Sequence, residues 1–126
     1  MRRHLLDASA LLALLHDEAG GDAVAALLPD GAMSTVNWSE VIQKAHAHAV
    51  PTAGLREDLE SIGVELLQFE PDDAEEAAGL WRDGARHLSL ADRACLATAR
   101  NRRMIAVTAD RDSLELDLDL EVRSIR

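Results

Sequence analysis

The sequence is poor in aromatic residues and in cysteine. Its 126 residues include one Phe, two Trp and no Tyr, which argues against the stacking platforms that hold single-stranded nucleic acid. The single cysteine, Cys95, excludes an intrachain disulfide and favours a reducing compartment. No signal-peptide pattern is visible at the start, and no apolar run approaches the ~20 residues that span a bilayer. We therefore expect a cytoplasmic protein that does not enter membranes.

Positive charge is scarce as well. The 13 basic residues face 23 acidic ones, and the net charge is −10 at pH 7. Because affinity for nucleic acid comes largely from neutralising phosphates, this balance disfavours a nonspecific polyanion binder. Several basic residues nevertheless gather in one part of the chain, at Arg93, Arg100, Arg102, Arg103 and Arg111. The cluster is either a basic surface or a solvated helix end favoured by the helix dipole.

The remaining composition indicates one folded domain over residues 1–126, since 48% of the residues are hydrophobic. Short apolar runs predict strands at 3–6, 32–36, 64–69, 104–107 and 121–125. Helical patterns cover 8–18, 22–28, 37–50, 52–62 and 71–86, followed by a helix that Ser89 opens. This alternation predicts an α/β fold, a three-layer α/β/α sandwich with a short, mainly parallel central sheet. The acidic alternation at 115–121 could extend the last strand as a protected edge.

Four acids lie near the ends of these elements. Asp7 and Asp110 directly follow strands, Glu40 follows the second strand closely, and Asp92 falls in the first turn of the helix opened by Ser89. Carboxyl ends of parallel strands and the starts of the following helices share one edge of the sheet, so we expect the four acids to converge. Each also has a simpler explanation: Asp7 as a helix cap, Asn37–Glu40 and Ser89–Asp92 as capping boxes, Asp110 as the start of an Asx turn.

Four converging carboxylates require a counter-charge. Two like charges about 4 Å apart cost about 4 kcal/mol at an effective dielectric of about 20. Oxygen ligands suit Mg²⁺ or Mn²⁺, whereas His46 and His48 are too close in sequence to form a zinc pair on one helical face. Carboxylate-held divalent ions support phosphodiester hydrolysis. No Ser-His-Asp set, phosphate-binding glycine loop or dinucleotide motif competes with this interpretation.

Four segments carry a family resemblance, in order and at matching spacing: Leu5–Leu11, Ser34–Val41, Leu88–Ala97 and Val107–Arg111. With them the chain resembles the PIN-domain ribonucleases, and among these the VapC-like toxins of bacterial type II toxin–antitoxin pairs. The resemblance implies an Mg²⁺- or Mn²⁺-dependent endoribonuclease that leaves a 5′-phosphate and a 3′-hydroxyl. It also implies a homodimer and a small antitoxin that covers the site.

The resemblance assigns roles to particular residues. Asp7, Glu40, Asp92 and Asp110 would bind the metal and act in catalysis, with Ser9, Thr108 and Asp112 orienting them. From the basic cluster, Arg93 and Arg111 are the residues we expect to contact RNA. The leucine-rich first helix and the region 37–62 are candidates for the antitoxin or dimer surface, unless their leucines simply pack in the core.

Two other functions stay open. A receiver-like phosphoacceptor domain fits the size, acidity and alternating topology. It needs adjacent acids after the first strand and a lysine after the last, whereas Asp7 is followed by Ala8-Ser9 and Lys44 is the only lysine. A catalytically silent PIN-like binding module would keep the fold and act only through its partners.

Overall fold

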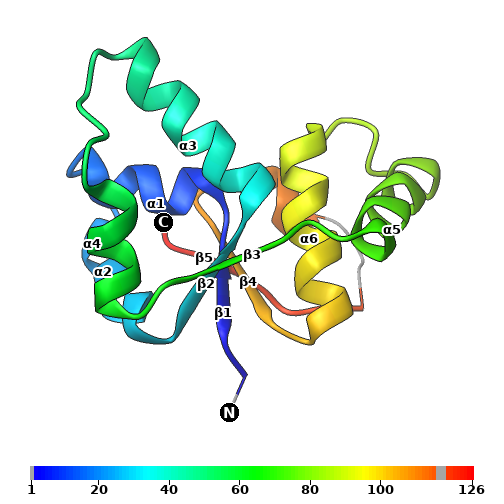
Figure 1. The fold of residues 1–126 in the computed structure, drawn as a ribbon. Coiled ribbons are helices and arrows are strands. Elements are labelled where there is room, and N and C mark those ends of the chain that lie inside the picture. Colours follow the sequence, from blue (N-terminus) through cyan, green and yellow to red (C-terminus); the bar gives the residue numbers. More distant parts are fainter. Residues whose placement is uncertain (1, 116–118) are drawn as a thin grey trace.

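A computed structural model describes residues 2–115 and 119–126 and contains a parallel sheet at its centre (Figure 1). The five strands of this sheet are β1 His4–Leu6, β2 Gly31–Ser34, β3 Glu65–Leu67, β4 Ile105–Thr108 and β5 Val122–Ser124. Their order is β3-β2-β1-β4-β5, and all four neighbouring pairs are parallel. The predicted α/β class is confirmed. The receiver fold has the order 2-1-3-4-5, so this order excludes the receiver-like alternative.

Helices cover both faces of the sheet. They are α1 Ala8–Leu15, α2 Gly21–Leu27, α3 Thr35–Ala47, α4 Leu55–Ile62, α5 Pro71–Arg82 and α6 Leu90–Arg102, with two short 3₁₀ turns, η1 Leu28–Asp30 and η2 Arg111–Glu115. In Figure 1, α1 to α4 lie on one side and α5 and α6 on the other. The three-layer sandwich is therefore confirmed.

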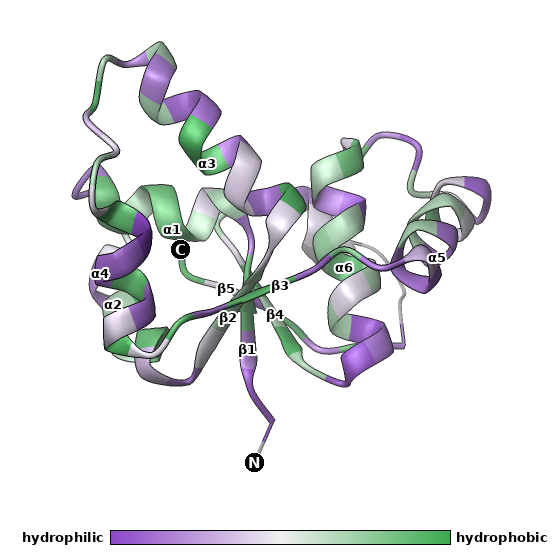
Figure 2. Ribbon diagram, in the orientation of Figure 1, coloured by the Kyte–Doolittle hydropathy of each residue, from purple (hydrophilic) through white to green (hydrophobic). Residues whose placement is uncertain are grey.

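Two apolar cores form because successive strand residues point to opposite faces. Leu5, Ala32 and Ala106 pack toward α5 and α6, where Cys95 is buried with small alanines. Their neighbours in sequence, Leu6, Met33 and Val107, pack toward α1 to α4. Figure 2 shows the resulting pattern, with apolar colouring along the strands and α1 and more polar colouring on α4 and α5.

The leucines of α1 divide between core and surface. Leu11 and Leu12 are buried, Leu14 is partly buried, and Leu15 is 37% exposed. Core packing thus explains Leu11 and Leu12, whereas Leu15 remains available to a partner. Within the described residues, no helix combines the length and the apolar character needed to cross a membrane.

Several element boundaries differ from the predicted ones. The strand expected to reach residue 36 stops at Ser34, because Ser34 caps α3 by accepting the Val36 amide at 3.2 Å. The Asn37–Glu40 capping box is therefore wrong, since α3 begins two residues earlier, at Thr35. The helix expected to reach residue 86 ends at Arg82, and Gly84 then turns the chain with a φ of +125°. The acidic run at 115–121 lies partly outside the described residues, which give β5 only as Val122–Ser124.

A buried carboxylate joins the two helices on the α5–α6 face. Asp73 is 1% exposed and accepts hydrogen bonds from Arg102 at 2.7 Å, the Glu70 amide at 2.9 Å and Asn101 at 3.0 Å. Burial alone would raise the pKa of Asp73, but these donors outweigh it and hold the pKa below its ordinary value. Asp73 therefore stabilises the fold in its ionised form.

Replacing Asp73 should weaken the packing of α5 on α6. We expect Asp73→Ala to lower the free energy of unfolding by about 3 kcal/mol, because it leaves Arg102 and Asn101 without their acceptor. The exposed neighbour Asp72 serves as the matched control, and Asp72→Ala should change stability by less than about 0.5 kcal/mol. Urea unfolding curves measure both, and equal losses in the two variants would contradict this role.

Candidate functional site

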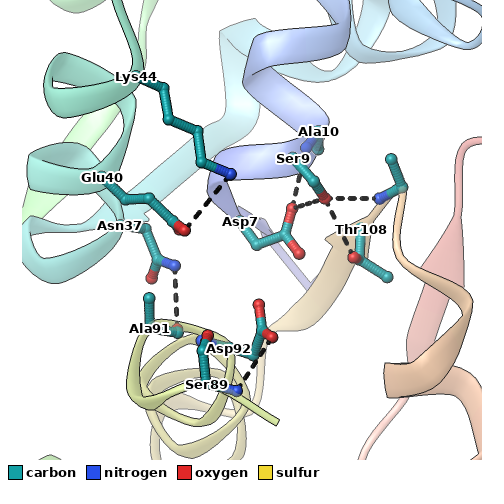
Figure 3. A network of polar contacts seen from close by, with 11 residues as sticks. Asp7, Ser9, Ala10, Asn37, Glu40, Lys44, Ser89, Ala91, Asp92 and Thr108 are labelled. Atoms are coloured by element: carbon teal, nitrogen blue, oxygen red, sulfur yellow. Dashed lines mark hydrogen bonds and ion pairs between the residues drawn. The ribbon is translucent and has the colours of Figure 1, made fainter. Parts of the chain in front are cut away.

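Asp7 lies where β1 ends and α1 begins. Its amide donates to the Val107 carbonyl at 3.0 Å, which fixes the backbone between β1 and β4. Its Oδ1 accepts the Ala10 amide at 2.9 Å as the helix cap and the Ser9 hydroxyl at 2.6 Å. Figure 3 shows the second carboxylate oxygen on the side that faces Asp92. The helix-cap role expected from sequence is confirmed, and it leaves one oxygen of Asp7 directed into the site.

Burial and a like charge make Asp7 a weaker acid than usual. The side chain is 4% exposed, and this burial raises the pKa of Asp7 to about 6. The Ser9 hydroxyl, the Thr108 hydroxyl and the Ala10 amide act in the opposite direction, whereas the negative charge of Asp92 raises the pKa further. Such a carboxylate favours a nearby cation over solvent, because a cation offsets both the burial and the repulsion.

A chain of hydroxyls supports Asp7. Since Ser9 gives its single hydrogen to Asp7, the Thr108 hydroxyl 3.3 Å away must be the donor between the two. Ser9 also accepts the Ala109 amide at 2.9 Å, and Thr108 accepts the Asp110 amide at 2.9 Å. The structure thus places Ser9 and Thr108 in a continuous hydrogen-bonded path from Asp110 to Asp7.

Asp92 reaches the same space from α6. The predicted capping box is confirmed: Ser89 Oγ accepts the Asp92 amide at 3.1 Å, and Asp92 Oδ2 accepts the Ser89 amide at 3.3 Å. The side chain points toward Asp7 (Figure 3). Because α6 begins at this edge of the sheet, as the sequence argument required, the two acids face each other.

Glu40 approaches from α3. Its Oε2 lies 3.6 Å from Lys44 Nζ, one helical turn away, and both side chains extend toward the space beside Asp7 (Figure 3). The buried Asn37 holds this helix against the start of α6 by donating to the Ala91 carbonyl at 3.0 Å. Sequence reasoning missed Asn37 and Lys44. The four-residue spacing of Glu40 and Lys44 was a visible signal, whereas the partner of Asn37 is remote in the chain.

Asp110 follows the end of β4, and its amide donates to the Thr108 hydroxyl at 2.9 Å. Its Oδ1 accepts the Asp112 amide at 2.9 Å, which forms the expected Asx turn. Asp112 thus contacts Asp110 through its backbone, and its side chain is exposed.

The structure brings together part of the predicted acid set. Over residues 2–115 and 119–126, no three His, Cys, Asp or Glu side chains are grouped closely enough to hold a metal ion jointly. Asp7 and Asp92 face each other with Glu40 alongside, so the four-ligand arrangement stays a prediction. Glu40, Asp92 and Asp110 are instead held by Lys44, the Ser89 amide and the Asp112 amide respectively. The four predicted ligands nevertheless fit Mg²⁺ or Mn²⁺, because all of their ligating atoms are carboxylate oxygens.

A model of the PIN domain matches residues 4–117. The chain belongs to the PIN-domain family. The family resemblance read from the four sequence segments is therefore confirmed.

Several solved structures of other proteins share the fold of this PIN domain. A toxin–antitoxin complex from Klebsiella pneumoniae is 23% identical, with 98% of each chain covered and a TM-score of 0.79. DNA-bound VapBC from Salmonella typhimurium is 17% identical, with 100% of each chain covered and a TM-score of 0.77. VapC20 from Mycobacterium tuberculosis, a sarcin-ricin loop cleaving toxin, is 20% identical, with 88% of this chain and 92% of that chain covered and a TM-score of 0.68. No curated protein sequence matches this chain.

Most of the basic cluster of this PIN domain supports the α5–α6 packing. Arg93 donates to the carbonyls of Ala77 at 3.1 Å and Leu88 at 3.4 Å. Arg100 pairs with Glu76 at 3.1 Å, and Arg102 pairs with Asp73. Arg111 is exposed on η2. The RNA contacts expected of Arg93 and Arg111 stay predictions. The guanidinium of Arg93 already donates to two backbone carbonyls, whereas Arg111 is exposed.

The raised pKa of Asp7 has a consequence for metal-free protein. A folded-state pKa above the unfolded one means that the folded state binds the proton more tightly, so wild-type stability falls as pH rises from about 4 to about 6. Asp7→Asn keeps an oxygen for the Ala10 amide and removes the charge. We expect it to gain about 2 to 3 kcal/mol over wild type across this window. Urea unfolding in EDTA at several pH values measures the difference, and parallel profiles would refute the assignment.

Proposed function

We propose that this PIN domain is a divalent-metal-dependent endoribonuclease that hydrolyses RNA and acts in the cytoplasm as the toxin of a toxin–antitoxin pair. The observation that carries the proposal is the pair Asp7 and Asp92, which face each other from α1 and α6 at the carboxyl edge of the sheet. Glu40 lies beside them (Figure 3), and the backbone amide of Asp110 connects to Asp7 through the hydroxyls of Thr108 and Ser9.

The residues of this edge suit phosphodiester hydrolysis. Bound Mg²⁺ or Mn²⁺ would neutralise the phosphate, activate water and stabilise the leaving oxygen. Asp7 and Asp92 would hold the ion, with Glu40 and Asp110 as further ligands, directly or through water. The Ser9–Thr108 path fixes the orientation of Asp7, and Asp112 fixes Asp110 through its amide. As the resemblance to PIN-domain ribonucleases implies, hydrolysis would leave a 5′-phosphate and a 3′-hydroxyl.

The structural neighbours support the biological role. The VapC20 structure is described as a toxin that cleaves the sarcin-ricin loop, and the Klebsiella structure as a toxin–antitoxin complex. By analogy we propose an RNA substrate, a small antitoxin partner and a homodimer for this chain. The apolar side chains exposed on the α1–α4 side, Leu15, Val50 and Ile62, are candidates for the partner surfaces.

The nuclease activity can be tested on protein freed of any partner. The purified chain should cleave structured regions of total bacterial RNA with Mg²⁺ or Mn²⁺ and not with EDTA, and the new ends should carry 5′-phosphates. Asp92→Asn should lower the cleavage rate on the order of 100-fold or more, because it removes a charge that faces the reacting group. Asp72→Asn, an exposed acid at the start of α5, should cleave like wild type.

Two results would contradict the proposal. Undiminished cleavage by Asp92→Asn would point to a contaminating nuclease. Absence of cleavage by wild type, together with tight antitoxin binding, would support the silent binding module instead.

Metal binding can also be measured without RNA, through its effect on the stability of the protein. Mg²⁺ or Mn²⁺ at about one hundred times its Kd should raise the free energy of unfolding by about 2.7 kcal/mol, because the ion binds only the folded state. Asp92→Asn should lose most of this gain, whereas Asp72→Asn should keep it. Thermal unfolding with and without metal measures the effect. Equal gains in all three proteins would place the metal elsewhere.

A further inference from the structure

A cavity of about 360 Å³ opens next to the acids, on the side of α1 and α3. Its lining includes Ser9, His16, Lys44, His48, Asp110 and Arg126. Ser9 and Asp110 belong to the hydrogen-bonded path that ends at Asp7, so the cavity adjoins the candidate site directly. Figure 3 shows Lys44 extending from α3 toward Asp7 and Ser9.

The polar groups of the cavity differ in how firmly they are held. Glu18 is paired with Arg126 at 3.0 Å and lies 3.5 Å from His16 Nδ1. The rings of His16 and His48 meet edge to face, with centroids 5.7 Å apart. Lys44 has the loosest contact, since its ammonium lies 3.6 Å from Glu40 and its side chain is 51% exposed. An exposed ion pair of this kind contributes little to the free energy of folding. An incoming anion can therefore replace Glu40 as the partner of Lys44 at little energetic cost.

Other basic groups of the surface are either paired or lie away from the acids: Arg2, Arg3 and Arg103 line a cavity at the amino ends of β1 and β4, beside Glu65 and Met104. The arginines Arg93, Arg100 and Arg102 are engaged with α5 and its carboxylates. A hollow of about 670 Å³ near the start of α5 is lined by five acids, Glu70, Asp72, Asp73, Glu75 and Glu76, and by only two arginines, Arg82 and Arg102, so its net charge repels phosphate. In a chain of net charge −10, a cation beside the acids is where phosphate can be attracted toward the site.

We propose that this cavity binds the RNA backbone, with the Lys44 ammonium and the ring N–H groups of His16 and His48 contacting a phosphodiester next to the one that is cut. The inference rests on the proposed ribonuclease function and adds the path of the substrate, which runs over α1 and α3. Lys44 acts there as a binding residue: it exchanges Glu40 for a phosphate oxygen. Asp110 and Glu18 limit how deeply the phosphate enters, because both carry negative charge.

Binding to a short fluorescein-labelled single-stranded RNA in EDTA tests this path apart from cleavage. Lys44→Gln should raise the Kd by about tenfold and reduce the slope of log K against log salt by about 0.7, the value for one lost phosphate contact. Lys44→Arg should retain most of the affinity, since it keeps the charge. His48→Ala should weaken binding with a smaller change in the salt slope.

The chain offers a control in Arg56, which pairs with Glu60 on α4 at the same four-residue spacing and is also more than half exposed to solvent. Arg56→Gln changes the net charge identically and should leave the Kd and the salt slope unchanged. A second control separates Lys44 from Glu40: in a Glu40→Gln background, Lys44→Gln should still weaken binding. Thermal midpoints should be nearly unchanged in all of these variants, because exposed ion pairs contribute little.

Any of the following results would overturn the inference. Equal effects of Lys44→Gln and Arg56→Gln would reduce the result to net charge and overturn the inference, as would an unchanged Kd for Lys44→Gln. Loss of the Lys44 effect in the Glu40→Gln background would assign it to Glu40. RNA cleavage with metal at a KM that Lys44→Gln leaves unchanged would overturn the subsite and leave the ribonuclease function standing. Neither cleavage nor binding would overturn both.

Discussion

The hydrogen bond from the Ala10 amide to Asp7 is the constraint on which the site depends. It begins α1, and it does so with the same carboxylate that faces Asp92. Because the Asp7 backbone is also bonded to Val107, the acid cannot move without disturbing both the sheet and the helix. Burial at this point makes the charge unfavourable in the empty protein, so stability and readiness to bind a cation are opposed in one residue.

Two further hydrogen-bonded contacts position the helices that carry Glu40 and Asp92. The Ser89–Asp92 capping box fixes the first turn of α6, and the bond from Asn37 to the Ala91 carbonyl anchors α3 to that turn. The buried amide of Asn37 therefore helps to position Glu40 and Asp92 relative to each other. Glu40 and Asp110 are held by the nearby donors Lys44 and the Asp112 amide, and among the described residues no three acids are grouped closely.

The sequence was most informative where the signal is local. The Ser89–Asp92 capping box and the start of α5 at Pro71 both depend on near neighbours, and both were predicted from the sequence. Asn37 was misassigned because a capping-box pattern fitted its neighbours, whereas its partner lies 54 residues away. Arg93 was assigned to RNA from its place in the basic cluster. Its bond to the carbonyl of Ala77, 16 residues away, could not be seen in the sequence, and its RNA contact stays a prediction. Topology places the starts of α1 and α6, and with them Asp7 and Asp92, at one edge of the sheet. The separation of the acids' oxygens depends on rotamers and on a counter-ion.

The double duty of Asp7 also limits how this chain could change over generations. A descendant that abandoned chemistry while keeping its architecture would still need an acceptor at this position to begin α1, so Asn, Ser or Thr would be tolerated there and aliphatic residues would not. Position 92 also needs an acceptor, because the side chain of Asp92 accepts the Ser89 amide, although this bond is longer than the one that begins α1. Inactive relatives would then be recognised by polar, uncharged replacements at these two positions, a pattern that random drift at a purely catalytic residue would not produce.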